Sequence, residues 1–545
     1  MILFLIGSSE LLGCTEEPKE PQRFQVELSQ GTVSVADPSL AWPGVVGVPN
    51  LDDDDGDGVD DWSSGLGEDD DDYTTFFVEP GSSRLRLILK EGRDEVRIYW
   101  DGEVVLDEDQ TEVLIRPSDG IVELRAEYRS FLSEALIEVE EGATGEILEL
   151  ALTGSPLILN HHLQPADLVM MMRVSYGPGL DNNGMINQYK DVLGADRFLR
   201  ITPGDYDWDV WVQDEIEFAT LNSTDGHVDV IIDSIRNGQG QPGSGLDNLA
   251  EDEFSRPGWV IRTWGDGQAT GQDFFGNLEV SPPVTVDGVW YPFGRIYYGS
   301  TTALYKPNAE LEDFLDSQKV QAPFKLDTSW LIVGHVDEYS STIPDSSSEK
   351  GFKFLMADTR LAWELLEAAD PETELTRYAL NPPYYGHDIA TIGEMLEDTS
   401  LRAVNEDVQD ILDGELEKFR VGLGLEDEDI ILVPTLFHEE YSGWDAVVAL
   451  TPGMINLIVA EDVDGVPTLF VPDPMLRTDI ESTDGDPFVA YLEEALPEDL
   501  RIEWMDDWFV YHMGLGEVHC GSNVVRPSAD ALWWEDATHL LTKED

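Results

Sequence analysis

Residues 228–237, VDVIIDSIRN, join an apolar run to a polar one. The apolar run at 228–232 predicts a buried strand, because short runs rich in Val and Ile are typical of sheet interiors. Comparable strands are predicted at 430–433 and 455–460, and helical stretches at 359–369 and 401–421. Repeated alternation of strands and helices predicts an α/β architecture for the region from Leu157 onward.

The region before Leu157 consists of short stretches in which apolar and polar residues alternate. Turn signals such as Glu91-Gly92 separate these stretches. Short strands of period two predict a β-sandwich, which we place at 46–155. The expected strands lie at 84–89, 96–100, 112–115, 122–126 and 135–139. The whole chain is therefore expected to be a multidomain α+β protein.

The composition of the 545-residue chain is strongly acidic, with 111 Asp and Glu against 32 Lys and Arg and a formal net charge of −79. This balance excludes phosphate-backbone binding as the main function, since that needs a basic face, and it argues against docking on anionic lipid by charge alone. It favours cationic partners, either metal ions or substrates that carry Lys or Arg. The alternative is an acidic surface that serves solubility in salty surroundings.

The N-terminal segment 1–14 opens with an apolar run and ends in Leu-Leu-Gly-Cys14. This resembles the end of a bacterial lipoprotein signal, which implies a cell-envelope or extracellular protein anchored through a lipid on Cys14, with residues 15–45 as a tether. No basic residue precedes the run and Glu10 interrupts it, so a chance cysteine in a frayed terminus is the alternative. Cys14 and Cys520 are the only cysteines, which excludes a disulfide framework.

An acidic loop near the start of the predicted sandwich has the pattern D-x-D-x-D-G-x-x-D. Alternating carboxylates in a tight loop can surround Ca²⁺, which binds six to eight oxygens, and a glycine permits the sharp turn. No Glu stands at the twelfth position, so the loop is not an EF-hand. The alternative is a solvated acidic linker. The predicted calcium ligands here are Asp53, Asp55, Asp57 and Asp61.

Cys520 is the single cysteine of the α/β region and lies in a glycine-flanked segment, GEVHCGSN (516–523). A lone cysteine with a distant histidine and carboxylates is a candidate nucleophile constellation. The alternative is an inert buried thiol. A second alternative, zinc bound by this segment and the GHVDE segment (334–338), lacks the usual ligand spacing.

His335 and Asp337 are expected to point to one face if their segment is a strand, and Asp214 is a third polar group in the same region. Two carboxylates match the planar fork of a guanidinium, and holding it fixes the central carbon for attack by a thiolate. A histidine can then protonate departing ammonia and activate water. The residue types therefore fit hydrolysis of a guanidine through a covalent intermediate.

Several long segments resemble the protein-arginine deiminases, the calcium-dependent enzymes that convert peptidyl-arginine to citrulline. The matching stretches are WVQDEIEF (211–218), IDSIRNG (232–238), FGNLEVSPPVTVDGVWYPFGRI (275–296), WLIVGHVDE (330–338) and GEVHCGSNV (516–524). The resemblance covers nearly all of 156–545 and implies the five-bladed α/β propeller, or pentein fold, of the guanidine-modifying superfamily. The acidic loop and sandwich resemble the family's middle, immunoglobulin-like calcium-binding domain. The family's other N-terminal domain has no counterpart.

The resemblance assigns roles to single residues. Cys520 would be the nucleophile and His335 the general acid/base. Asp214 and Asp337 would hold the guanidinium nitrogens, and Trp211 would pack on the aliphatic stem of the substrate.

The resemblance also implies two calcium sites in this region. Gln213 and Glu215 flank Asp214, so metal binding would fix the backbone that carries this catalytic residue. One site would be made by Gln213, Glu217, Phe275, Leu278 and Glu279, with Phe275 and Leu278 acting through their carbonyls, and the other by Glu215, Asp233, Ser234 and Asn237.

Arg236 matches a family position that helps to recognise the substrate backbone. Some family members carry a second arginine two residues on, where this chain has Gly238. This departure bears on the choice between a peptide and a free guanidine as substrate. Three hypotheses follow: a calcium-activated peptidylarginine deiminase; an enzyme acting on a free guanidine such as arginine or agmatine, or moving the amidino group; and a non-catalytic calcium-dependent binding protein at the cell surface.

Overall fold

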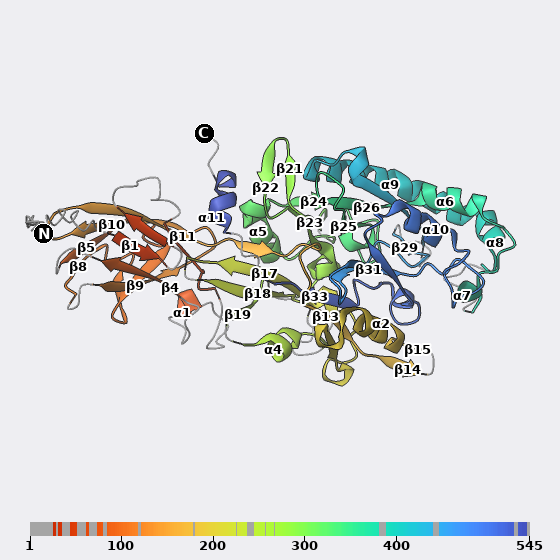
Figure 1. Cartoon of the computed structure of the whole chain (residues 1–545), viewed down its shortest axis with the longest axis horizontal. Helices are drawn as coiled ribbons and strands as arrows, with labels where there is room; N and C mark the ends of the chain where they lie inside the picture. The colour runs from red at the N-terminus through yellow and green to blue at the C-terminus, as the bar shows by residue number, and fades with distance from the viewer. Residues whose placement is uncertain are drawn as a thin grey trace, which may run out of the picture. The chain divides into compact units, whose positions relative to one another are not determined.

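The computed structural model of the chain forms two compact units, Met1–Ser155 with Ser223–Gly226, and Pro156–Asn222 with His227–Asp545 (Figure 1). The described residues are 25–28, 31–34, 44–51, 61–64, 73–79, 84–117, 121–177, 180–224, 226–236, 245–256, 258–265, 268–302, 304–380, 389–439, 446–527 and 532–541. Cys14 and the acidic-loop residues Asp53, Asp55 and Asp57 lie outside them, and Asp61 begins the short helix α1 (Asp61–Ser64).

The first unit is built from two sheets that share one hydrophobic core. Side chains alternate along β5, where Leu85, Leu87 and Leu89 are fully buried, so period two places one face of each strand inside. One sheet has the order β2 (Gly31–Ser34), β1 (Gln25–Leu28), β4 (Thr74–Glu79), β9 (Val122–Tyr128), β6 (Val96–Trp100) and β7 (Glu103–Leu106). The other has the order β3 (Val45–Gly47), β11 (Ile147–Gly154), β10 (Glu134–Glu141), β5 (Leu85–Glu91) and β8 (Glu112–Ile115).

The five strands expected from period two are present as β5, β6, β8, β9 and β10. The pattern did not predict β1, β2, β3, β4, β7 and β11, and β1 and β2 lie within residues 15–45, which were expected to form a tether. In β11 the last five residues are all buried, so the alternation that marks a half-buried strand is lost there.

The second unit contains five sheets that repeat one pairing pattern within its described residues. In each sheet a central strand pairs antiparallel with one neighbour and parallel with the other. The antiparallel neighbour, central strand and parallel neighbour are β17 (Ile216–Asn222), β18 (His227–Asp233) and β19 (Trp259–Thr263); β20 (Leu278–Val280), β23 (Ile296–Gly299) and β24 (Phe324–Leu326); β25 (Ser340–Pro344), β26 (Phe352–Asp358) and β27 (Ile430–Pro434); β30 (Ile458–Glu461), β31 (Pro467–Pro472) and β32 (Arg501–Met505); and β33 (Ser522–Val525), β13 (Leu168–Met172) and β16 (Phe198–Ile201).

Shorter strands and helices complete this unit. The strand β12 (Leu157–Leu159) pairs with β17 and so extends the sheet of β17, β18 and β19. Three two-stranded sheets are also present: β14 (Ser175–Gly177) with β15 (Leu180–Asp181), β21 (Val284–Val286) with β22 (Val289–Tyr291), and β28 (Phe437–His438) with β29 (Val448–Ala449). The helices are α2 (Asn183–Leu193), α3 (Val212–Glu215), α4 (Leu249–Phe254), α5 (Ala309–Ser317), α6 (Thr359–Ala368), α7 (Thr376–Ala379), α8 (Ile392–Glu397), α9 (Thr399–Leu423), α10 (Pro487–Ala495) and α11 (Trp533–Asp536). No helix in the described ranges is long and apolar enough to cross a bilayer.

The predicted helices at 359–369 and 401–421 correspond to α6 and α9, which pack against the sheet of β26 and β27 (Figure 1). The side chain of Asp398 caps α9 by accepting from the amides of Ser400 and Leu401, and Gly424 ends the helix with a left-handed backbone. These local signals mark both ends of α9 in the sequence.

One local expectation was wrong. The segment of His335 and Asp337 is not a strand, because Val336–Glu338 forms a single 3₁₀ turn. Gln213, Asp214 and Glu215 likewise lie in a helical turn, α3, and a strand begins only at Ile216. In both places buried polar side chains turn inward at the end of a loop, which period-two reasoning cannot predict.

Candidate active site

A cavity of about 800 Å³ in the second unit brings together residues that lie far apart in the sequence. It is lined by Cys520, His335 and Asp214, and by Trp211 and Arg236. Its size lies within the range of pockets that enclose whole small-molecule ligands, so it has room for more than one amino-acid side chain.

Two residues that line this cavity, Asp214 and Cys520, and three residues in contact with the site hold equivalent places in the five sheets. Each stands just before the strand that pairs antiparallel with the central strand of its own sheet. Asp214 precedes β17, Gly276 precedes β20, Asp337 precedes β25, Asn456 precedes β30 and Cys520 precedes β33. Each of the five sheets therefore places one residue at the site or next to it, although the five segments have no common sequence motif.

The thiol of Cys520 is buried beside a carboxylate. Its Sγ lies 3.5 Å from Oδ2 of Asp337 and accepts a hydrogen bond from the side-chain amide of Asn456 at 3.2 Å. Burial, together with the charges of Asp337 and Asp214, raises the pKa of the Cys520 thiol well above its ordinary value. A cation bound between these carboxylates would offset their charge and so favour the thiolate.

His335 and the two carboxylates surround a single glycine. A Cβ atom at Gly276 would lie 2.6 Å from Nδ1 of His335 and 3.1 Å from both Oδ1 of Asp214 and Oδ2 of Asp337. The imidazole is fixed by its Nε2–H, which donates to the carbonyl of Gly271 at 2.9 Å, so Nδ1 faces the cavity 3.6 Å from Asp214. Glycine keeps this space open where three reactive side chains meet.

Trp211 forms one wall of the cavity beside Cys520. Its ring meets that of Tyr511 edge-on, with centroids 5.9 Å apart, and packs on the backbone of Gly516. A Cβ at Gly516 would lie 2.4 Å from the Trp211 ring and 3.2 Å from Cβ of Cys520. The flat ring and bare backbone make a narrow slot suited to an unbranched aliphatic stem.

Arg236 lies at the side of the cavity but is already bound by acids. Its guanidinium contacts Asp209 at 2.8 Å and Glu215 at 3.1 Å, and lies over the ring of Phe274 with 5.0 Å to the centroid. Gly238, the position of a second arginine in some relatives, lies outside the described residues.

The sequence model of the protein-arginine deiminase family matches residues 149–535, which include every residue of this cavity. The chain belongs to the protein-arginine deiminase family. It is 35% identical to human protein-arginine deiminase type-4 over 343 residues, 60% of this chain and 48% of that protein. It is 33% identical to the rat type-4 protein over 390 residues (70% and 55%) and 30% identical to the human type-1 protein over 429 residues (76% and 62%). The chain thus spans about half the length of the relatives that it matches.

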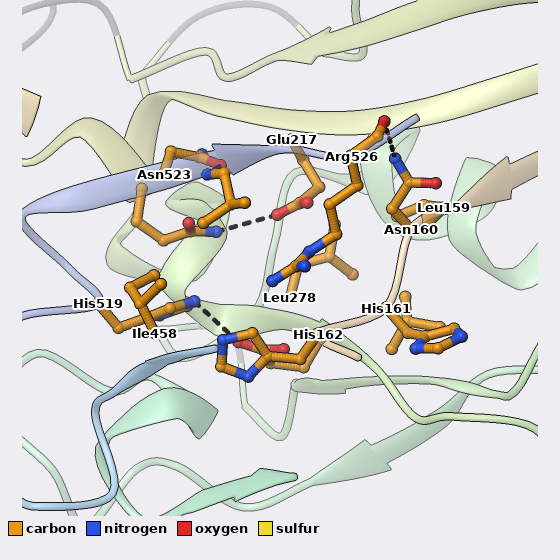
Figure 2. A pocket seen from close by; sticks show the side chains of 14 residues that line it. Leu159, Asn160, His161, His162, Glu217, Leu278, Ile458, His519, Asn523 and Arg526 are labelled. Carbon is orange, nitrogen blue, oxygen red and sulfur yellow. Dashed lines mark hydrogen bonds and ion pairs between the residues drawn. The ribbon is translucent and has the colours of Figure 1, made fainter. Parts of the chain in front are cut away.

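Four of the first set of expected calcium ligands in this deiminase-family chain, Gln213, Glu217, Leu278 and Glu279, line a second, small cavity of about 40 Å³ (Figure 2). Glu217 points into it from β17, with Glu279 on another side. Burial raises the pKa of Glu217 to about 7 and that of Glu279 to about 8. The side-chain amide of Gln213 contacts Glu217 at 2.9 Å and the carbonyl of Phe275 at 3.4 Å. Buried carboxylate, amide and carbonyl oxygens around a space larger than one water fit a hard cation.

The same cavity contains groups that the sequence left without a role. His161, His162, His519 and Arg526 line it, and Figure 2 shows them around Glu217. His519 joins the two sites, because its Nδ1 lies 2.9 Å from Oδ2 of Asp337 and its Nε2 lies 3.6 Å from Glu279.

The second set of expected ligands lies on the other side of Asp214. Oε1 of Glu215 and Oδ1 of Asp233 are buried and have no hydrogen-bond partner among the described residues. Burial raises the pKa of both carboxyls well above the ordinary range. Glu251, which the sequence did not suggest, adds its charge to Asp233, whereas Asn237 lies outside the described residues. Orphaned buried carboxylate oxygens fit a cation here as well.

No group of three or more His, Cys, Asp or Glu side chains placed to hold a metal ion was found in the described part of the chain. A calcium ion at either place would therefore draw on amide, hydroxyl or carbonyl oxygens in addition to carboxylates. Ser234 is one such hydroxyl, and it now donates to the carbonyl of Asp273 at 2.8 Å.

Proposed function

We propose that this chain hydrolyses the guanidinium group of arginine side chains in peptides or proteins, giving citrulline and ammonia. The observation that carries the proposal is that Cys520, His335 and Asp214 line one cavity, with Asp337 next to Cys520, in a chain of this family. Two carboxylates and a nucleophile around one open space match the shape and charge of a guanidinium.

In the proposed reaction, Asp214 and Asp337 accept hydrogen bonds from the guanidinium nitrogens and hold its carbon against Sγ of Cys520. The thiolate attacks this carbon, an S–C bond forms, and a C–N bond breaks as His335 protonates the departing ammonia. His335 then takes a proton from water, which attacks the thiouronium carbon. The S–C bond breaks, the thiolate returns, and the new C=O belongs to citrulline.

Calcium fits this proposal as a structural activator. Gln213, Glu217 and Glu279, with the carbonyls of Phe275 and Leu278, would hold one ion, and Glu215, Asp233, Ser234 and Asn237 another. When bound, calcium neutralises carboxylates that are costly to bury. Asp214 lies between Gln213 and Glu215, so fixing these two neighbours also fixes Asp214. The loop of Asp53, Asp55, Asp57 and Asp61 is proposed as a further site.

The finer architecture also belongs to this proposal. Five sheets of one pairing pattern, each with one residue at the cavity or next to it, support a five-bladed α/β propeller over 156–545. Two sheets around one core support an immunoglobulin-like, calcium-binding sandwich, which begins before the expected 46–155 because β1, β2 and Val45 of β3 belong to its sheets. A lipid anchor at Cys14 and a place in the cell envelope rest on the N-terminal resemblance alone.

The test measures citrulline and ammonia released from a blocked arginine peptide, with calcium and with chelator, beside Cys520→Ser. Calcium-dependent citrulline that is lost in the variant supports the proposal. Turnover of free arginine or agmatine but not of the peptide would instead favour the free-guanidine enzyme, which the engagement of Arg236 by Asp209 and Glu215 keeps open. Binding of arginine peptides by folded, calcium-loaded protein without ammonia release would favour the binding protein.

A further inference from the structure

The large cavity extends beyond the slot between Trp211 and Cys520. Its outer wall carries two aromatic side chains, Tyr176 from β14 and Trp208. Their ring centroids lie 6.5 Å apart, and the two residues are 55% and 48% exposed, respectively. Large aromatic residues that stay exposed while they line a pocket indicate a ligand-binding surface.

Trp208 is held in this place by an unusual backbone. Asp207 and Trp208 have φ values of 51° and 65°, so two consecutive non-glycine residues adopt the left-handed conformation. Pro203 begins the short turn before them, and its carbonyl accepts the amide of Trp208 at 3.0 Å. The indole is thus presented by a hydrogen-bonded turn of the main chain.

The charge next to these rings is negative. Asp207 is exposed, accepts only the amide of Gly245 at 3.2 Å, and forms no ion pair within the described residues. The neighbouring Asp209 is different, because Arg236 already neutralises it at 2.8 Å. The outer wall therefore offers two aromatic faces and one uncompensated carboxylate.

We infer that Tyr176, Asp207 and Trp208 form a subsite for a second cationic side chain, a lysine or arginine that neighbours the target arginine in the peptide. The inference rests on the proposed deimination and names its preferred substrates. The faces of both rings and the carboxylate all attract a cation, which stabilises its binding. A neutral side chain is stabilised only by contact with the rings, and an acidic side chain is repelled by the carboxylate.

The test compares kcat/KM for blocked peptides in which lysine or glutamine flanks the target arginine, on either side in turn. The wild type is expected to prefer the lysine peptide about fivefold, the effect of one partly exposed cation–π contact. Asp207→Asn combined with Trp208→Leu should bring the ratio close to one. Trp290→Leu, which removes an equally exposed tryptophan that does not line the cavity, should keep the ratio.

Binding to the Cys520→Ala protein, measured by calorimetry with the same peptides, separates this inference from the proposed function. Preference for the lysine peptide in binding, without any turnover by the wild type, would keep the subsite and overturn the deimination. Turnover of both peptides with a ratio near one, unchanged in the double variant, would overturn the subsite and keep the deimination. Equal binding without turnover would overturn both.

Discussion

The side-chain amide of Asn456 donates one hydrogen bond to Sγ of Cys520 and another to the backbone carbonyl of Asp337, both at 3.2 Å. Its carbonyl oxygen accepts the backbone amides of His519 at 2.9 Å and Cys520 at 3.2 Å. One buried amide thus ties the proposed nucleophile to the turn that carries Asp337. No other residue in the described chain donates a hydrogen bond to this sulfur.

Asn456→Asp is expected to lower kcat roughly 10- to 100-fold on a blocked arginine peptide, with KM changed much less. The new carboxylate still accepts the two backbone amides, but it cannot donate to Sγ and it adds a charge that opposes the thiolate. Asn405→Asp is the matched control, because Asn405 is equally buried and its amide also spans two backbone carbonyls, those of Leu401 and Phe437. An equal loss of kcat in both folded variants would contradict a specific role for Asn456.

Gly516→Ala should reduce kcat/KM by at least about tenfold while leaving the protein folded. The added methyl group would lie 2.4 Å from the Trp211 ring, so the ring must shift and the slot beside Cys520 must change shape. Gly414→Ala in α9 serves as control, since a Cβ there meets nothing within 4 Å. Steady-state kinetics and circular dichroism of both variants would check this. Unchanged kinetics in Gly516→Ala would show that Trp211 does not shape the substrate slot.

Calcium should raise the melting temperature of the wild type, because an ion that binds only the folded state adds about 2.7 kcal/mol when its concentration is 100 times Kd. The increase in melting temperature should be smaller in the double variant Glu217→Gln/Glu279→Gln. These substitutions remove both carboxylates of the small cavity that His519 also lines. Glu312→Gln is the control, since this buried carboxylate pairs with lysines. Calorimetry with calcium and with chelator measures the shifts; equal increases in all three proteins would exclude calcium from this cavity.

The stability of the protein should depend on the burial of His512. Burial lowers the pKa of this imidazole to about 4, and its Nδ1 lies 2.7 Å from Glu517, whose own pKa burial raises to about 8. Burial also raises the pKa of the neighbouring Asp507. The unfolded chain binds a proton at His512 near pH 6.5 and the folded chain does not, so this contribution is present above pH 6.5 and is lost as pH falls toward 4.

The matching experiment follows the free energy of unfolding of the wild type and of His512→Gln by urea denaturation at pH 7 and pH 5. Between these values the wild type should lose about 2 kcal/mol more than the variant. The comparison cancels the titration of shared groups that lie away from His512. A loss of the same size in both would show that His512 is protonated in the folded protein.

Much of the fold could be predicted from local patterns. Period two marked five strands of the sandwich, and capping at Asp398 with Gly424 marks the long helix α9. The predictions failed where burial removes alternation, as in β11, and where a polar segment closes a turn, as at Val336–Glu338. The sequence of a fully buried strand, or of a turn around a site, has no regular alternation of apolar and polar residues from which the structure could be predicted.

The candidate site could be predicted only in part for a related reason. Cys520 and His335 stood out because of their chemical types and the segments around them. Asn456 lies in an apolar stretch that was expected to be a strand, and nothing in its immediate sequence distinguishes it from a buried structural asparagine such as Asn405. Its role follows from its place before β30, which corresponds to the place of Cys520 before β33.

The sequence by itself determined the family, the residue types available for guanidine chemistry and the excess of acidic charge, because these depend only on which residues are present and in what order. Only the tertiary structure decided that Gly276 lies between His335 and Asp214, that His519 bridges Asp337 and Glu279, and that Asn456 donates to Sγ of Cys520. These relationships join segments that are far apart in the sequence, such as His519 and Asp337, which are 182 residues apart, and they arise from the packing of five similar sheets.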